Sequence, residues 1–133
     1  MKLGVTGVEA TLATRRLMEA QAVDLVTFRR DGTPVHTPVL STPYAGTLLI
    51  RTHHTAGKLK RLKHNREVTV APSSGHGRTS APGERGTATI LPASETAACL
   101  KLLHQRHGLI GRVSTWVRHL RGLKDVFIEV RLV

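Results

Sequence analysis

The chain has 133 residues, which suffices for one domain with its own hydrophobic core and is too short for two independent domains. Hydrophobic residues make up 40% of the chain and charged residues 22%, a composition that excludes a disordered tail. The 20 Lys and Arg against 9 Asp and Glu give a net charge of +11, which favours polyanionic partners such as nucleic acid, an acidic membrane or a phosphate-rich cofactor.

The residue types present argue against several of these partner classes. Aromatic residues make up only 3%, too few for the stacking surfaces that bind single-stranded nucleic acid, and the cations are not confined to one recognition helix. Cys99 is alone, so no intrachain disulfide or thiolate metal cluster can form, and we expect a buried, inert thiol. The histidine pairs have no nearby carboxylate, so no metal site is predicted. No apolar run is as long as a membrane span and no signal peptide is recognisable, so we expect a cytoplasmic protein without a membrane partner.

Helical spacing of apolar residues predicts a first helix over about residues 6–20. Two strands follow, 23–29 and 35–40, joined by a turn that the Asp31-Gly32 pair marks. Pro38 has no N–H for a ladder hydrogen bond, so its strand should lie at an edge, at a bulge or beside a ligand. A second turn over residues 44–46 then leads into a strand over 47–52.

The remaining elements are predicted from the same signals, with turn formers over residues 73–83 indicating a mobile loop. They are a basic helix over about 56–65, strands over 67–71 and 84–91, a helix over 93–107 capped by Gly108, a second helix, and a strand over 126–131. The second helix carries one apolar stripe that we expect in the core, formed by Val113, Trp116, Val117 and Leu120. Together the elements predict an α+β, mainly β fold, a six-stranded antiparallel split β-barrel with peripheral helices in a single domain over residues 1–133.

The junction between the third strand and the basic helix is the most informative segment. Arg51 and Thr52 end the strand, and Gly57 and Lys58 begin the helix, where unpaired N–H groups and the helix dipole attract anions. The junction therefore favours a phosphorylated molecule as its ligand. The alternative is an ordinary basic helix with Leu59 and Leu62 facing inward and its cations facing water.

Two motifs, residues 27–39 and Arg51-Thr52 followed by residues 57–62, resemble the split β-barrel family of flavin- and deazaflavin-binding proteins related to pyridoxamine 5'-phosphate oxidase. Residues 65–72 and 86–88 extend the resemblance, which is strongest to the branch that uses the deazaflavin coenzyme F420. The resemblance implies an oxidoreductase that transfers a hydride from reduced F420 to an electron-poor small molecule. FMN is the alternative cofactor, and a non-catalytic cofactor-binding protein is the alternative function. A nucleic-acid-binding protein is the least favoured alternative.

The resemblance also assigns roles to single residues and implies no catalytic side chain. Along the cofactor ring and its linker would lie Thr37, Pro38 and Val39; the phosphate would be bound by Arg51, Thr52, Gly57 and Lys58, and the acidic tail reached by Arg61. A homodimer with the cofactor between its subunits is implied as well, with residues 73–83 approaching the partner's cofactor. The chain departs from the family at Ala56, where Ser is frequent, and at Leu40, where an aromatic residue is common.

Overall fold

Six antiparallel strands and three helices make up the computed structural model, which describes residues 7–73 and 83–133. In chain order the elements are α1 (Gly7–Glu19), β1 (Ala22–Phe28), β2 (Pro34–Tyr44), β3 (Thr47–His53), α2 (Gly57–His64), β4 (Glu67–Pro72), β5 (Glu84–Ile90), the 3-10 turn η1 (Ala93–Glu95), α3 (Thr96–Leu120) and β6 (Asp125–Leu132). Each predicted helix and strand is present, with boundaries that differ by a few residues. The predicted loop over 73–83 lies, apart from its two ends, outside the described residues.

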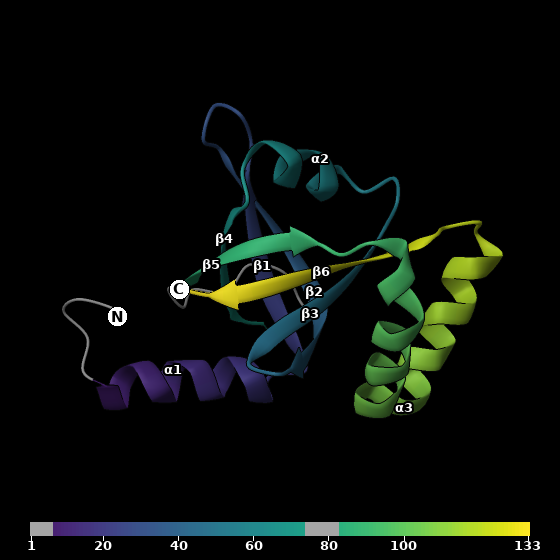
Figure 1. Cartoon of the computed structure of the whole chain (residues 1–133), viewed down its shortest axis with the longest axis horizontal. Coiled ribbons are helices and arrows are strands. Elements are labelled where there is room, and N and C mark those ends of the chain that lie inside the picture. Colours follow the sequence, from purple (N-terminus) through teal and green to yellow (C-terminus); the bar gives the residue numbers. More distant parts are fainter. Residues whose placement is uncertain (1–6, 74–82) are drawn as a thin grey trace.

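The strands close into a barrel in the order β1-β2-β3-β6-β5-β4 (Figure 1). The pairs β1–β2 and β2–β3 are hairpins, β4 pairs with β1 and β5, and the last strand, β6, inserts between β3 and β5. The turns carry the residues that their geometry requires. Gly32 has a φ of 88°, and the Thr33 N–H donates to Asp31 Oδ1 at 2.9 Å. The predicted split β-barrel is therefore confirmed.

The barrel is split where β2 and β3 diverge. These two strands pair only through Ser41–Tyr44 and Thr47–Ile50. Residues 34–40 of β2 consequently pair with β1 alone, and residues 51–53 of β3 pair with β6 alone, among the residues described. Pro38 belongs to the β2 side of this split, where a missing N–H costs no ladder bond, as its position in the sequence predicted.

The main core fills the barrel and continues under two helices. Leu17 of α1 closes one end, and Leu59 and Leu62 of α2 close the other (Figure 1). The fully buried members of this core on the strands are Val23, Leu25, Leu48, Ile50, Val68, Val70, Ala88, Ile128 and Val130. They alternate with outward-facing residues, as a half-buried strand requires.

A smaller core lies between the outside of the barrel and α3. It contains Leu49, Cys99, Leu103 and Phe127. Burial raises the pKa of the Cys99 thiol, in agreement with the predicted inert thiol. At Gly108 (φ 59°, ψ −133°) the helix breaks, so α3 is a hairpin of two arms that lie side by side in Figure 1. Gly108 thus ends the first arm, as predicted.

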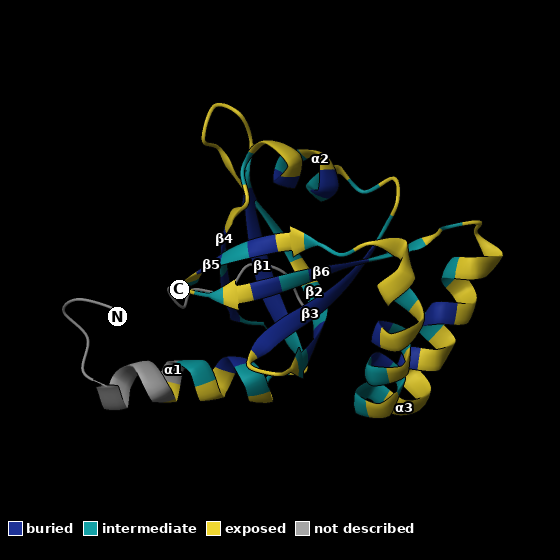
Figure 2. Cartoon of the chain, viewed as in Figure 1, coloured by how far each residue is buried: buried dark blue, intermediate teal, exposed yellow. Residues whose placement is uncertain are grey.

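The second arm of α3 faces the opposite way from our prediction. Its small and polar residues Gly111 and Thr115 are buried, whereas Trp116 is 63% exposed. Much of α3 is coloured as exposed in Figure 2. A Cβ at position 111 would lie 2.9 Å from Leu103 Cδ2, so glycine permits the close approach of the two arms. The predicted core stripe is exposed along its whole length, at Val113, Trp116, Val117 and Leu120. No helix that the structure describes combines the length and apolar character needed to cross a bilayer.

Candidate anion-binding site

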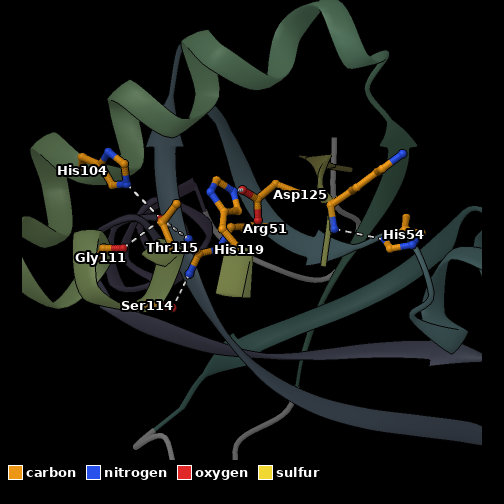
Figure 3. Close-up of polar contacts among 9 residues, drawn as sticks. Arg51, His54, His104, Gly111, Ser114, Thr115, His119 and Asp125 are labelled. Atoms are coloured by element: carbon orange, nitrogen blue, oxygen red, sulfur yellow. Dashed lines mark hydrogen bonds and ion pairs between the residues drawn. The ribbon is translucent and has the colours of Figure 1, made fainter. Parts of the chain in front are cut away.

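Arg51 lies on the outer face of β3, under the second arm of α3, and only 5% of it is exposed. Its Nη1 donates to Thr115 Oγ1 at 2.6 Å and its Nη2 donates to Ser114 Oγ at 2.5 Å (Figure 3). The Thr115 hydroxyl donates in turn to the Gly111 carbonyl at 2.9 Å. It therefore accepts from His104 Nε2 as well, at 2.9 Å. Arg51, a predicted phosphate ligand, thus anchors α3 with both terminal nitrogens, and its Nε has no acceptor among the residues that the structure describes.

Arg118, on the same arm of α3, is the charged residue that sequence reasoning missed. Its Nη1 is buried and has no hydrogen-bond partner among the described residues. Burial lowers the pKa of Arg51, of His53 and of Lys58, and in each case the charge of Arg118 is the next cause. Arg118 therefore brings α3 into the charged cluster that the sequence located at the junction of β3 and α2.

Lys58, in the first turn of α2, is half-buried in this cluster. Burial, followed by the charges of Arg118 and Arg61, lowers its pKa to about 8. Ala56, the residue before the helix, is the N-cap and makes no side-chain cap hydrogen bond. In the first turn the Leu59 N–H already donates to the Ala56 carbonyl at 3.2 Å, so Gly57 and Lys58 provide the N–H groups that a ligand could meet. Gly57 lies against Arg61, because a Cβ there would be 3.1 Å from Arg61 Nη1. The positive end of the helix dipole, the Lys58 side chain and the Arg61 guanidinium therefore all lie near the first turn of α2.

Thr52 adds a hydroxyl that is completely buried, since the residue is only 1% exposed, and its Oγ1 has no partner in the described structure. We call the residues Arg51, Thr52, Gly57, Lys58 and Arg118 the cationic cradle. Asp125 carries the negative charge that favours the charged form of Arg51. Its carboxylate also accepts a hydrogen bond from His119 Nε2 at 3.0 Å. Positive charge in the cradle therefore exceeds negative charge, and unused buried donors are costly unless an acceptor meets them.

Arg61 connects the cradle to a second basic region. Its Nε donates to the buried Thr27 Oγ1 at 2.6 Å, and burial followed by the charge of Arg29 lowers its pKa. Beyond it lies an open pocket of about 340 Å³, lined by Phe28, Arg29, Arg30, Lys60, Arg61 and His64. We call it the basic pocket. Arg30 Nη2 donates to His64 Nε2 at 2.8 Å across it.

The other three predicted site residues lie on the β2 side of the split. Thr37 pairs with Leu25 and Val39 pairs with Val23, so both side chains share the inward face of the barrel, and Val39 packs against the core. Pro38 is exposed on the outward face. A ligand at the split would therefore meet the backbone of this segment and the Pro38 ring.

A histidine beside this segment is held by a buried carboxylate. His36 Nδ1 donates to Asp24 Oδ2 at 2.8 Å, and the Asp24 side chain is only 2% exposed, whereas that of His36 is 27% exposed. Because an ionised carboxylate only accepts, the proton sits on Nδ1, and Nε2 is left for another partner. Sequence reasoning missed this pair, since register alone places Asp24 opposite Pro38. Elsewhere in residues 7–73 and 83–133, no three His, Cys, Asp or Glu side chains gather as around a metal ion.

No model of a known protein family matches the sequence, and no curated protein matches it either. Solved structures do match. An F420 reductase is 22% identical with a TM-score of 0.59, covering 88% of this chain and 90% of its own. The heme storage protein HutZ from Vibrio cholerae is 14% identical with a TM-score of 0.62, covering 100% of this chain and 92% of its own.

A FAD-binding protein from Mesorhizobium loti is 14% identical with a TM-score of 0.60, covering 96% of this chain and 88% of its own. At such identities the likeness concerns the fold alone. The chain therefore has the fold of proteins that are named for quite different cofactors.

Proposed function

We propose that the cationic cradle binds the phosphate of a deazaflavin or flavin cofactor and that the protein is an oxidoreductase. The observation that carries this proposal is the set of buried donors without acceptors, Arg51 Nε, Thr52 Oγ1 and Arg118 Nη1, beside the depressed pKa of Lys58. A phosphate supplies several acceptor oxygens and at least one negative charge, which would compensate the excess positive charge of Arg51, Lys58 and Arg118. The names of the F420 reductase and of the FAD-binding protein that share this fold agree with such a cofactor.

The basic pocket favours coenzyme F420 over FMN. F420 carries an acidic tail beyond its phosphate, whereas FMN ends at the phosphate. Arg61 lies against Gly57 of the cradle and also lines the pocket, so a chain of negative groups leaving the cradle would meet Arg61 first. The cations Arg29, Arg30 and Lys60 would then attract the tail.

The reduced cofactor, when bound, supplies a hydride to an electron-poor small molecule. The chain's own residues would hold the phosphate in the cradle and present the unpaired edge of residues 37–39 to the ring. His36 would present Nε2 beside that edge, where it could relay a proton from solvent, with Asp24 fixing its ring through Nδ1. Hydride and proton together complete a two-electron reduction of the acceptor.

Fluorescence titration of the purified protein with F420 and with FMN tests the proposal, and duplex DNA serves as a third ligand. We expect F420 to bind, and Lys58→Ala to weaken its binding roughly tenfold to hundredfold through loss of a charge-assisted contact. The matched control is Lys63→Ala, which removes the same charge from an exposed position on the same helix. Equal affinity of the wild-type protein and Lys58→Ala for F420 would place the phosphate elsewhere.

Turnover separates an enzyme from a carrier. With reduced F420 and a simple quinone as a model acceptor, oxidation of the cofactor is followed by absorbance, and binding without oxidation would favour the non-catalytic alternative. Tight binding of FMN alone would favour the flavin alternative. A homodimer with the cofactor between its subunits stays a prediction of the family resemblance, which sedimentation velocity with and without cofactor checks.

A further inference from the structure

The second arm of α3 exposes more apolar surface than any other described part of the molecule. Leu109 and Ile110 at its start are 76% and 75% exposed. At 100° per residue they join Trp116 and Leu120 in one continuous stripe. We call it the apolar stripe, and its members are Leu109, Ile110, Val113, Trp116, Val117 and Leu120. A contiguous exposed surface of six large apolar side chains on one helix marks an interaction site.

The stripe faces solvent because the arm packs its other face against the protein. Its opposite face, with Gly111, Ser114, Thr115 and Arg118, is turned to the barrel and the first arm by the hydrogen bonds of Arg51 and by the close approach at Gly111. The stripe is therefore held outward by specific contacts of the fold. What covers it must come from outside the described chain.

The charges around the stripe indicate the kind of partner. Arg112 and His119 lie along one edge of it, and Arg121 and Lys124 follow its C-terminal end, all of them exposed. The segment from residue 96 to residue 124 contains no Asp or Glu. Asp125, the next residue, has a side chain only 2% exposed that accepts from His119. The rim of the stripe therefore presents positive charge with no exposed carboxylate of its own.

From these observations we infer that the apolar stripe docks the protein onto an anionic lipid surface. A helix with Leu, Ile and Trp on one side and Arg and Lys at its edges lies in the headgroup region, with its apolar side chains in the acyl boundary. Trp116 is 63% exposed and lies at the edge of the stripe that borders Arg112 and His119, and indole rings favour the boundary between headgroups and acyl chains. A second copy of the chain fits less well, because two stripes face to face would bring like charges together in a protein of net charge +11. This inference is independent of the proposed cofactor and differs from the sequence-based expectation of no membrane partner, which the same experiment tests.

Trp116 is the only tryptophan of the chain, so its emission reports on the stripe directly. The full chain is mixed with vesicles of phosphatidylcholine alone or with phosphatidylglycerol added, and binding is measured by co-sedimentation. We expect a shift of the emission to shorter wavelength and co-sedimentation with the anionic vesicles, both reduced by salt and by omission of phosphatidylglycerol. Leu109→Ser or Leu120→Ser, each at an exposed site, should lower the partition constant roughly tenfold.

Leu12→Ser is the matched control, since Leu12 is an exposed leucine on another helix, α1, and outside the apolar stripe, so its loss should leave vesicle binding unchanged. Absence of binding to anionic vesicles overturns the inference. Binding that the two α3 variants leave unchanged overturns it as well, because charge alone would then explain the affinity. An emission shift that grows with protein concentration without vesicles, together with a dimer in sedimentation that Leu120→Ser dissociates, assigns the stripe to a second copy instead.

Discussion

Lys58 carries a charge in surroundings that disfavour it, and this makes stability depend on pH. In the folded protein its pKa is about 8, against an ordinary value of 10.5. Between those two values the unfolded chain binds more protons than the folded one, so the free energy of unfolding contributed by Lys58 rises as pH rises from about 8 to 10.5. Below pH 8 the lysine is protonated in both states and contributes no slope.

Thermal unfolding at several pH values in this range measures the effect. We expect the slope of Tm against pH to be smaller in Lys58→Met than in the wild-type protein, and unchanged in Lys63→Met, because Lys63 is exposed on the same helix. A phosphate ligand favours charged Lys58, so stabilisation by the ligand should decline as pH rises through 8. The same slope in all three proteins would contradict the burial of this charge.

Residues next to one another in the chain could be recognised from the sequence, whereas partners from distant elements could not. Gly57 and Lys58 stand out because a helix start makes its own N–H groups available. Arg118 joins them only because the hairpin of α3 folds back over β3, and no local pattern marks it. The same holds for Asp24 and His36, which meet diagonally across two strands.

At the level of elements, periodicity identified the faces of the second arm of α3 correctly but not the direction in which they point. An apolar stripe normally faces a core, which is why Val113 and Trp116 were expected there. Tertiary contacts decide otherwise, because a buried guanidinium needs acceptors and only the polar face of the arm provides them, through Ser114 and Thr115. The break at Gly108, by contrast, is a local backbone property and was predicted.

Thr115 is therefore a main determinant of how the arm docks. Thr115→Val keeps the shape of the side chain but removes the oxygen that accepts from Arg51 Nη1 and His104 Nε2. Leaving a buried guanidinium nitrogen unpaired should lower the free energy of unfolding by about 1–3 kcal/mol. Urea denaturation followed by circular dichroism measures this as a lower midpoint at unchanged slope.

Val113→Thr makes the reverse exchange at an exposed position of the same arm. We expect it to shift stability by less than about 0.5 kcal/mol, as surface substitutions usually do. If Thr115→Val were as stable as Val113→Thr, the hydrogen bonds of Arg51 would not hold the arm, and another contact would have to explain why the stripe faces outward.

For the whole molecule, the first two hairpins could be predicted from the sequence, because short connections with strong turn signals join β1 to β2 and β2 to β3. Asp31-Gly32 and the turn at Ala45 and Gly46 each fix a hairpin locally. The split was predicted together with the barrel, but its exact place was not, because it depends on how far β2 extends beyond the residues that pair with β3. Pro38 gave the one local sign that part of β2 has an unpaired edge.

The net charge of +11 gives the last prediction, because it acts on the whole fold as well as on the cradle. Like charges repel in the compact state, and salt screens them over a Debye length of about 10 Å at 0.1 M. We therefore expect sodium chloride to raise Tm gradually.

Inorganic phosphate at matched ionic strength should raise it further, because it binds the folded cradle specifically. In Arg118→Gln the response to sodium chloride should persist while the additional response to phosphate disappears, since the variant loses the unpaired Nη1 but keeps most of the net charge. Identical responses to the two salts in the wild-type protein would mean that the excess charge is general and that the cradle has no special affinity for phosphate.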